Sequence, residues 1–504
     1  MTVLFRADAS NLIGTGHVMR CVTLANQFKT FNADCVFACR SILPVLARRI
    51  EEAGHELVML PEVLSSNAGN TPHAAWLAAS WQDDAKSTAV VAGDRRVSWI
   101  VVDHYGLDAG WESRVATDGR KIAVIDDLAD RDHSCSVLVD QNLHASPQAR
   151  YTSRVPDNCQ MLLGPRYALL RPEFSGRPDH IRKFVSKAVV FLVAFSGADS
   201  AKLTGMAIQV LAEVCRPVDL VHIVAGSQNM GIVEITKQCA VLGWQLHVDT
   251  DRVAELMLAS DVAMGAGGGM LWERAAMGLP TVAIAIAGNQ KEQVAQAAAQ
   301  GLVLGCDLET LNHGLLHEMI LRLRDDVELR QHMSAACRAA VDGLGATRVA
   351  RRLVDPKITL RPAAERDSQN IYAWRNDERI RRVSSSAEII SHDVHAQWFA
   401  ATLAAPSRHL LVAEDMQGAL GVVRFDTTGV SAEVSIYLVP SRLGSGQGAS
   451  LLLASESWLV NNNPEIGKIV AEVLPGNVAS EELFRSCGYH FEKGVFVKRT
   501  GKRA

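Results

Sequence analysis

The chain has 504 residues, of which 48% are apolar and 21% charged, and its formal net charge is −4 at pH 7. This length exceeds what one hydrophobic core normally serves, so the sequence predicts two to four domains of about 100 to 200 residues each. The composition is that of a globular protein, no stretch approaches the roughly 18 apolar residues of a membrane span, and the acidic balance argues against nucleic acid as the main partner.

The amino terminus, MTVLFRADAS, lacks a basic segment followed by a long apolar one, so we expect no signal peptide and a cytoplasmic location. The ten cysteines then predict reduced thiols rather than disulfides. Cys35 and Cys39 are the closest pair, but no second pair of Cys or His completes a four-ligand zinc site. We therefore expect no metal.

Strand and helix patterns alternate from the start of the chain. The β-rich runs are VLFRA, DCVFACR, HELVML, WIVVDHY, KIAVIDDL and VLVDQN, with a helix from about residue 16 to 31 after the first. The stretch LLGPRYALLRPEFSGRPDH interrupts them with three prolines and two glycines, and a second series runs through KAVVFLVAFSG, LVHIVAGS, WQLHVD, DVAMGAGGG and TVAIAIAG. Alternating strands and helices predict parallel sheets covered on both faces. We predict two Rossmann-like α/β domains, at 1–165 and 183–355, joined by a linker at 166–182, with a ligand cleft between them.

The pattern changes after ARRLVDPK, where Pro356 marks the expected join. Strands at HLLVAED, LGVVRFD, AEVSIYLV and KIVAEVL, with helices between them, predict a mixed α+β domain at 357–504.

The turn GTGH places Gly14 and Gly16 before a helix and His17 at its start. Glycines allow a sharp turn and a close backbone approach, and the helix would aim free N–H groups at an anion such as a pyrophosphate. Alone this is a weak signal, because a histidine in such a turn more often caps or packs.

Four segments add to it: RADASNLIGTGHVMRC, VVDHYGLDAGWE, IDDLADRDHSCSVLVDQN and LLGPRYALLRPEF. Together they resemble the UDP-sugar hydrolases of the pseudaminic-acid pathway, which remove UDP from UDP-2,4-diacetamido-2,4,6-trideoxy-β-L-altropyranose. The resemblance runs to about residue 350 and implies the two-domain GT-B architecture, related to the N-acetylglucosaminyltransferase of peptidoglycan synthesis. It also implies that His17 is catalytic, and an imidazole titrating near neutral pH suits the activation of water.

Polar residues at the ends of the first-half strands extend this candidate site. Asp8 either satisfies backbone N–H groups of a turn, or orients His17 or holds a sugar hydroxyl. Arg6 shares its strand face. Further candidates end the later strands: Asp103, His104, Tyr105, Asp126, Asp127 and, more weakly, Asn142.

In the second half, MGAGGGMLWERAAMGLP opens a helix with glycines and predicts a phosphate seat, the alternative being a tight turn with a solvated glutamate. The resemblance implies that Glu273 accepts hydrogen bonds from the ribose hydroxyls. The UDP-sugar contacts expected in this half are Ser196, Gly197, Gly267, Gly268, Gly269, Glu273, Asn289 and Gln290.

The third domain resembles the GNAT N-acetyltransferases over about residues 357 to 500. LRPAAERDSQNIYAWRNDERIRR is similar to their first strand and helix, SIYLVPSRLGSGQGASLLL to their pyrophosphate loop, and IVAEVLPGNVASEELFRSCGYHF to their final strand, helix and turn. The resemblance implies acetyl-CoA as cosubstrate, although Leu443 replaces the family's arginine or glutamine and Arg442 stands one residue early. The expected acetyl-CoA contacts are Leu438, Val439, Arg442, Gly444, Ser445, Gly446, Gly448 and Asn477.

Glu472, on the strand IVAEV, is the expected base for the acceptor amine, directly or through water. The family's tyrosine acid corresponds to Phe484, which has no proton to give. Either Tyr489 or water replaces it, or the CoA thiolate leaves unaided.

The two resemblances converge, because the pathway acetylates the 4-amino group of a UDP-sugar immediately before UDP is removed. We therefore predict a bifunctional enzyme with an α/β, GT-B-like pair of Rossmann-type domains followed by a GNAT α+β domain. Two alternatives stay open: a GT-B glycosyltransferase with an accessory acetyltransferase, and a UDP-sugar-binding protein whose acetyltransferase modifies a protein amino group. The sequence leaves the sugar's stereochemistry and the oligomeric state open.

Overall fold

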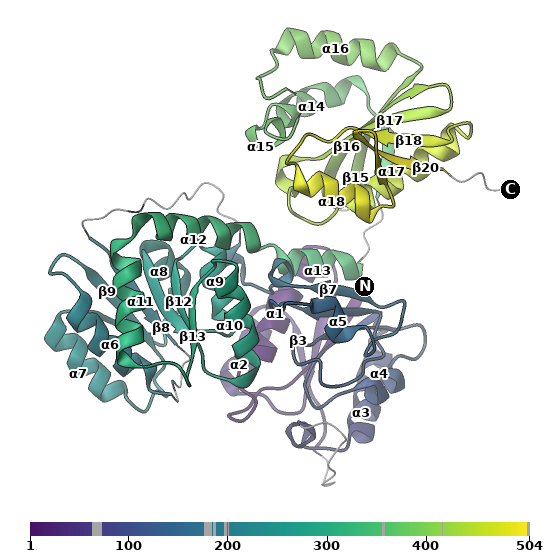
Figure 1. The fold of residues 1–504 in the computed structure, drawn as a ribbon. Helices are drawn as coiled ribbons and strands as arrows, with labels where there is room; N and C mark the ends of the chain where they lie inside the picture. Colours follow the sequence, from purple (N-terminus) through teal and green to yellow (C-terminus); the bar gives the residue numbers. More distant parts are fainter. Residues whose placement is uncertain are drawn as a thin grey trace. The chain divides into compact units, whose positions relative to one another are not determined.

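A computed structural model describes residues 1–62, 73–175, 184, 188–195, 199, 201–354, 358–384, 386–415 and 417–500. The chain divides into two compact units, Met1–Leu353 and Val354–Ala504. The first unit contains two parallel sheets and the second a mixed sheet (Figure 1). None of the helices in the described ranges is long and apolar enough to cross a membrane.

The first half of unit one is a seven-stranded sheet in the order β3-β2-β1-β4-β5-β6-β7, with all neighbours parallel. Its strands are β1 (Thr2–Ala7), β2 (Asp34–Cys39), β3 (Glu56–Met59), β4 (Trp99–Asp103), β5 (Lys121–Ile125), β6 (Val137–Asp140) and β7 (Gln160–Leu163). Its helices are α1 (Gly16–Lys29), α2 (Pro44–Glu52), α3 (Trp81–Asp94), α4 (Ala109–Val115) and α5 (Pro147–Tyr151). The strand order reverses between β1 and β4, and such a switch point opens a crevice at the carboxyl ends of the strands.

The sequence accounts for these elements directly. β4 is buried at every residue, as expected of a parallel strand with helices on both faces. In α1 the buried residues Val18, Cys21, Ala25 and Phe28 recur at steps of three and four and form one apolar stripe against the sheet.

The second half of unit one is a six-stranded parallel sheet in the order β10-β9-β8-β11-β12-β13. Its strands are β8 (Val190–Ala194), β9 (Leu220–Ala225), β10 (Gln245–Val248), β11 (Val262–Ala266), β12 (Thr281–Ala285) and β13 (Leu304–Asp307). Its helices are α6 (Leu203–Val214), α7 (Ile232–Leu242), α8 (Val253–Ala259), α9 (Met270–Ala276), α10 (Gly288–Ala299), α11 (His313–Asp325) and α12 (Val327–Ala340).

The chain passes between these halves twice. The first crossing follows β7 and includes the short helices η2 (Pro165–Tyr167) and η3 (Pro172–Phe174). The second is α13 (Gly345–Val354), which returns to the first half (Figure 1). There the Thr347 hydroxyl donates a hydrogen bond to Gln27 Oε1 at 2.9 Å.

The two crossings lie against each other. Arg348 Nη1 donates to the carbonyl oxygen of Arg166 at 2.7 Å. Gly345 comes so near the first crossing that a Cβ there would stand 2.3 Å from the carbonyl oxygen of Ala168. Glycine is therefore required at this contact.

The second unit is a seven-stranded mixed sheet in the order β14-β15-β16-β17-β18-β20-β19. Its strands are β14 (Thr359–Pro362), β15 (Arg408–Asp415), β16 (Gly418–Thr428), β17 (Ser431–Leu438), β18 (Lys468–Ala471), β19 (His490–Glu492) and β20 (Val495–Arg499). Its helices are α14 (Ser368–Arg375), α15 (Glu378–Arg381), α16 (His392–Ala404), α17 (Gly448–Asn462) and α18 (Val478–Ser486).

β17 and β18 are the parallel neighbours in this sheet, and they pair over only three residues of each strand. Ser431 to Glu433 of β17 face Lys468 to Val470 of β18. β17 continues to Leu438, while β18 ends at Ala471. In the described part of the domain the sheet therefore opens along the last residues of β17.

Candidate functional site

The GTGH turn delivers His17 to the start of α1. Gly14 has a φ of +83° and donates its N–H to the carbonyl oxygen of Ser10 at 2.8 Å, a left-handed turn that favours glycine. α1 begins at Gly16, and His17 in its first turn is 7% exposed. The turn therefore holds the imidazole at the carboxyl-terminal edge of the sheet.

His17 shares one carboxylate with an arginine. His17 Nδ1 lies 2.6 Å from Asp103 Oδ1, at the end of β4. Arg20, one turn further along α1, donates from Nε to Asp103 Oδ2 at 2.5 Å and from Nη2 to Asp103 Oδ1 at 2.6 Å. Burial raises the pKa of Asp103, but the charge of Arg20 and the hydrogen bonds from Arg20 and His17 outweigh it and hold that pKa well below its usual range. Asp103 is therefore an ionised acceptor.

Tyr105 and Asp127 complete the surroundings of His17. The Tyr105 ring packs edge-on against the imidazole, with centroids 4.6 Å apart, and its hydroxyl donates to Asp127 Oδ1 at 2.5 Å. Arg20 Nη1 donates to the other oxygen of Asp127 at 3.3 Å. Burial and the Asp127 carboxylate raise the pKa of Tyr105, so its hydroxyl keeps its proton.

The structure corrects the expectation for Asp8 and Arg6. Both side chains are fully buried, and their closest oxygen and nitrogen are 2.8 Å apart. Asp8 also accepts the backbone N–H groups of Arg40 and Ser41, which is the turn-carboxylate alternative. Neither residue is among those that line the cavity described below, and Asp103 rather than Asp8 holds His17.

Three other residues predicted from the strand ends are buried. Asp103 itself is fully buried beside His17 and is not among the residues that line the cavity. His104 Nε2 lies 3.4 Å from Asp8 Oδ2, and burial lowers the pKa of His104 to about 4. Asp126 is likewise buried, in an ion pair with Arg131 at 2.7 Å.

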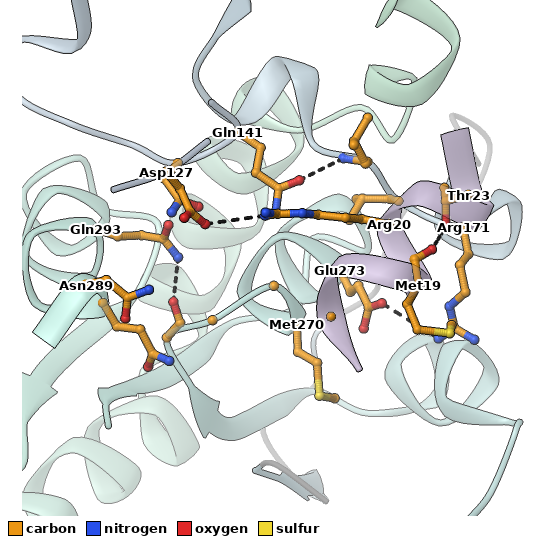
Figure 2. A pocket seen from close by; sticks show the side chains of 18 residues that line it. Met19, Arg20, Thr23, Asp127, Gln141, Arg171, Met270, Glu273, Asn289 and Gln293 are labelled. Atoms are coloured by element: carbon orange, nitrogen blue, oxygen red, sulfur yellow. Dashed lines mark hydrogen bonds and ion pairs between the residues drawn. The ribbon is translucent and has the colours of Figure 1, made fainter. Parts of the chain in front are cut away.

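A cavity of about 350 Å³ lies between the two halves of the first unit (Figure 2). Both halves and the first crossing line it, with these residues: Gly16, Met19, Arg20, Thr23, Asp127, Gln141, Asn142, Leu169, Leu170, Arg171, Gly267, Gly268, Gly269, Met270, Glu273, Asn289, Gln290 and Gln293. His17 is not among them, but Gly16 and Arg20 on either side of it are. The sequence expectation missed Arg20 and Arg171, whose positions in a helix and a linker carry no strand-end signal.

The glycines before α9 have two different roles. A Cβ on Gly267 would stand 2.2 Å from Val294 Cγ2, so this glycine serves packing against α10. Gly268 and Gly269 meet no such obstacle and line the cavity. Gly267 also lines the cavity, but it donates its N–H to the carbonyl oxygen of Ile284 at 2.9 Å, which leaves the N–H groups of Gly268 and Gly269 for a phosphate seat.

Glu273 faces the same cavity from α9. Its side chain is 17% exposed, and its Oε1 lies 3.7 Å from Arg171 Nη2 (Figure 2). Burial raises the pKa of Glu273, and Arg171 acts in the opposite direction. A half-paired carboxylate in a cavity is suited to accept hydrogen bonds from hydroxyl groups.

Two more predicted contacts, Asn289 and Gln290, stand in the first turn of α10. Gln290 lines the cavity, and its side-chain Oε1 accepts the N–H of Ile286 at 3.1 Å, which fixes the orientation of the side-chain amide. Asn142, from the opposite half, accepts a hydrogen bond from Trp272 Nε1 at 3.4 Å. Ser196 and Gly197 lie outside the described residues. Among the described residues, no group of three or more His, Cys, Asp or Glu side chains is arranged to hold a metal ion.

In the second unit, the glycine loop precedes α17 as the sequence predicts. Gly444 and Gly446 have φ values of +75° and +78°, and Gly448 begins the helix. Ser445 is buried, and its hydroxyl donates to Gln447 Oε1 at 3.4 Å. Left-handed glycines before a helix turn successive N–H groups toward one point, which suits an anion.

Three of the expected acetyl-CoA contacts make hydrogen bonds inside the domain. Arg442 is buried and its Nη2 donates to Asp415 Oδ1 at 2.6 Å. Asn477 Oδ1 accepts the N–H of Ser480 at 3.2 Å and caps α18. Val439 gives its N–H to the carbonyl oxygen of Leu420 at 3.0 Å, while Leu438 remains half-buried at the end of β17.

Glu472 is exposed and directly follows β18. Because Glu433 pairs with Val470, Glu472 lies level with Ser435 of β17, where the two strands have parted. Ala471 faces the core and Glu472 the opposite side of the sheet. Glu472 therefore stands at the opening of the sheet.

The two residues considered for the acid from the sequence, Phe484 and Tyr489, are both buried. Phe484 is buried and packs edge-on against Tyr489, with ring centroids 5.0 Å apart. Tyr489 is 2% exposed, and burial together with Glu456 raises the pKa of its hydroxyl. Tyr489 therefore does not suit the role of a solvent-connected acid, and water or unaided departure of the thiolate remains the expectation.

Comparison with known proteins agrees with this division. Residues 357–490 match the family model of the acetyltransferase (GNAT) domain. The UDP-2,4-diacetamido-2,4,6-trideoxy-beta-L-altropyranose hydrolase of Campylobacter jejuni is 25% identical over 303 residues, which are 60% of this chain and 97% of that protein. An uncharacterised protein of Methanocaldococcus jannaschii is 21% identical over 97% of this chain and 96% of its own length.

Among solved structures, MurG of Acinetobacter baumannii matches with a TM-score of 0.52 at 14% identity, over 70% of this chain and 99% of that one. This likeness and the two parallel sheets confirm the predicted fold class. The chain thus joins a GT-B-like first unit, whose sequence resembles a UDP-diacetamido-trideoxy-altropyranose hydrolase, to a carboxyl-terminal GNAT acetyltransferase domain.

Proposed function

We propose that the chain is a bifunctional sugar-nucleotide enzyme of nonulosonic (pseudaminic) acid biosynthesis. Its GNAT domain acetylates the 4-amino group of a UDP-4-amino-4,6-dideoxy sugar, and its first unit hydrolyses the resulting UDP-2,4-diacetamido-2,4,6-trideoxyhexose to free sugar and UDP. The observation that carries the proposal is the His17–Asp103 pair beside a cavity shared by two Rossmann-like halves, in a region similar to such a hydrolase. A cytoplasmic location fits both substrates, UDP-sugar and acetyl-CoA.

In the proposed hydrolysis, His17 is the base. Ionised Asp103 can only accept a hydrogen bond, so Nδ1 of His17 carries the proton and Nε2 keeps its lone pair. Nε2 takes a proton from water while the water oxygen bonds to the anomeric carbon and the bond from that carbon to the UDP oxygen breaks. The imidazolium then returns the proton to solvent.

The opposite wall of the cavity would hold the nucleotide. Glu273 accepts hydrogen bonds from the ribose hydroxyls, and the N–H groups near Gly268 and Gly269 face the diphosphate. Asn289 and Gln290 lie where they would contact the sugar.

In the proposed acetyl transfer, the loop of Gly444, Gly446 and Gly448 holds the pyrophosphate of acetyl-CoA. Glu472 removes a proton from the acceptor amine, directly or through water, and the amine nitrogen bonds to the acetyl carbon as the thioester C–S bond breaks. CoA leaves as a thiolate, which its thiol pKa of about 8.5 makes tolerable.

One competing function has structural support. The fold resembles that of MurG, and GT-B scaffolds also transfer sugars to acceptors other than water. A glycosyltransferase would release little free sugar unless an acceptor were added.

The decisive experiment incubates the full chain with acetyl-CoA and a panel of UDP-2-acetamido-4-amino-2,4,6-trideoxyhexoses, without any acceptor. We expect stoichiometric CoA, UDP and free diacetamido sugar, identified by mass spectrometry and proton NMR. CoA release without UDP release would leave only the acetyltransferase, and UDP release that requires an added sugar acceptor would establish the glycosyltransferase instead.

A further inference from the structure

Arg20 occupies an unusual place beside His17. The two residues are three positions apart on α1 and therefore lie on the same face of the helix. Asp103 Oδ1 accepts from both His17 Nδ1 and Arg20 Nη2, at 2.6 Å in each case. Arg20 Nη2 also lies 3.4 Å from His17 Nδ1. One carboxylate thus serves two cationic or potentially cationic groups.

We propose that Arg20 is a positioning residue for His17, which fixes the orientation of Asp103 and keeps the imidazole in the neutral form that accepts a proton from water. The inference rests on the proposed hydrolysis, and it concerns how that reaction is made possible near neutral pH.

Another histidine of the same half faces two carboxylates, of which Asp126 is shared with Arg131 and Glu112 forms no ion pair with an arginine among the described residues. His133 Nδ1 lies 2.7 Å from Glu112 Oε1, and its Nε2 lies 3.8 Å from Asp126 Oδ2. Burial disfavours its charged form, but the two carboxylates outweigh burial and raise the pKa of His133 to about 9. Such a histidine is an imidazolium at pH 7 and cannot act as a base.

At His17 the Arg20 charge opposes that effect. A guanidinium remains charged at every relevant pH, so it stays bound to Asp103 and repels a second positive charge on the imidazole. The amino-terminal end of α1 acts in the same direction, because its dipole is positive there.

The other groups around His17 do not supply a charge that could replace that of Asp103 or Arg20. Tyr105 is held protonated, His104 has a pKa of about 4, and Asp127 is bound by both Arg20 and Tyr105. His73 stands behind the Tyr105 ring, with centroids 5.3 Å apart. Among the described residues, the charges that face His17 directly are those of Asp103 and Arg20.

Removal of Arg20 should shift the pH profile of hydrolysis to higher pH. Without Arg20, His17 would pair with an unshared carboxylate and bind its proton more tightly. Hydrolysis requires the neutral imidazole, so the rising limb of its pH profile would move to higher pH, by about 1 to 2 units for the loss of one close charge. At pH 7 the rate would fall about tenfold or more, and it would recover toward that of the wild type at high pH.

The test compares Arg20→Gln, Arg20→Lys and the control Lys29→Gln, which changes an exposed charge at the far end of the same helix. The pH dependence of kcat/KM for UDP release is measured on UDP-2,4-diacetamido-2,4,6-trideoxyhexose from about pH 5.5 to 9.5 with the full chain. We expect Arg20→Gln to shift the rising limb upward, Arg20→Lys to keep it within about half a unit of the wild type, and Lys29→Gln to leave the profile unchanged.

A rate loss in Arg20→Gln that is equal at every pH would overturn the inference, because it would show a merely structural role. A wild-type profile in that variant would overturn it too, while leaving the hydrolase assignment intact. If Arg20→Gln does not fold, Arg20→Lys decides. A shift of the rising limb of its pH profile to higher pH, although the cation is retained, contradicts the proposal. A rising limb at the wild-type pH supports it. Absence of UDP release from the wild type would overturn the proposed function itself and the inference with it.

Discussion

Asp103 shows how a single residue can have a role different from the one its position suggests. It ends β4 among other polar residues, a place typical of a substrate contact, yet its carboxylate is fully buried behind His17 and Arg20. The sequence predicted that polar residues gather at this edge, and they do. Which of them reach the cavity depends on side-chain packing, and the strand pattern does not contain that information.

Glu273 is the residue through which nucleotide binding can be tested. Glu273→Ala removes a partly buried carboxylate that the proposal assigns to the ribose hydroxyls. We expect the affinity for UDP to fall by about 1 to 3 kcal/mol, measured by isothermal titration calorimetry. Glu255→Ala, an exposed glutamate on α8, is the control, and equal affinities in the two variants would place the nucleotide elsewhere.

Glu472 allows a sharper test, because it is exposed and bears no core packing. Glu472→Gln keeps the shape and removes the base, so acetylation should fall by about 10² to 10⁴-fold. CoA release is followed with a thiol reagent across about pH 6 to 9. Glu433→Gln, at the exposed glutamate on the adjoining strand, is the comparison: if the loss follows Glu433 instead, the base has been assigned to the wrong strand.

The wall of the cavity depends on a contact between α10 and the segment after β6. Glu292 of α10 accepts from Arg150 Nη1 at 3.2 Å, and its Oε2 lies 3.0 Å from His144 Nδ1. Asn142 and Asn289, on the same two segments, line the cavity. The contact therefore joins the two halves beside the candidate site.

Glu292→Gln should loosen this junction. The Glu292 side chain is 45% exposed, so we expect the substitution to remove about 1 kcal/mol of interaction free energy between the halves. This should appear as a rise of several-fold in KM for the UDP-sugar, with kcat little changed. Because salt screens exposed charges, the difference from the wild type should shrink at high ionic strength. Glu309→Gln, whose partner Lys291 belongs to the same half, is the matched control and should change neither constant.

For the whole molecule, the order of strands and helices was predictable because hydrophobic periodicity and the breaks between segments are local properties of the sequence. The α/β class rests on that periodicity, the GT-B and GNAT architectures rest on the two resemblances, and the fold class is confirmed. Arg20 and Arg171 were not predictable, because their partners Asp103 and Glu273 lie far along the chain. The buried roles of Arg442 and Tyr489 depend on packing in the same way.

Since the chain forms two compact units, the two proposed reactions should be separable. His17→Ala should acetylate the 4-amino UDP-sugar and accumulate the UDP-diacetamido sugar, whereas Glu472→Gln should hydrolyse that intermediate but not form it. An equimolar mixture of the two variants should therefore restore the free diacetamido sugar, followed by mass spectrometry. A mixture that makes the intermediate but no free sugar would show that the intermediate does not pass between molecules.

The two crossings of the chain in the first unit limit how its halves can move. Because Gly345 touches Ala168 and Arg348 binds the carbonyl of Arg166, both connections meet at one place beside the cavity. Two connections that contact each other at one place resist sliding and twisting of the halves, because either motion would separate the two connections. They permit rotation of the halves about the line on which the connections meet. We therefore expect the easiest relative motion of the halves to be rotation about that line, which opens and closes the cavity, and we expect substrate entry and product release to follow it.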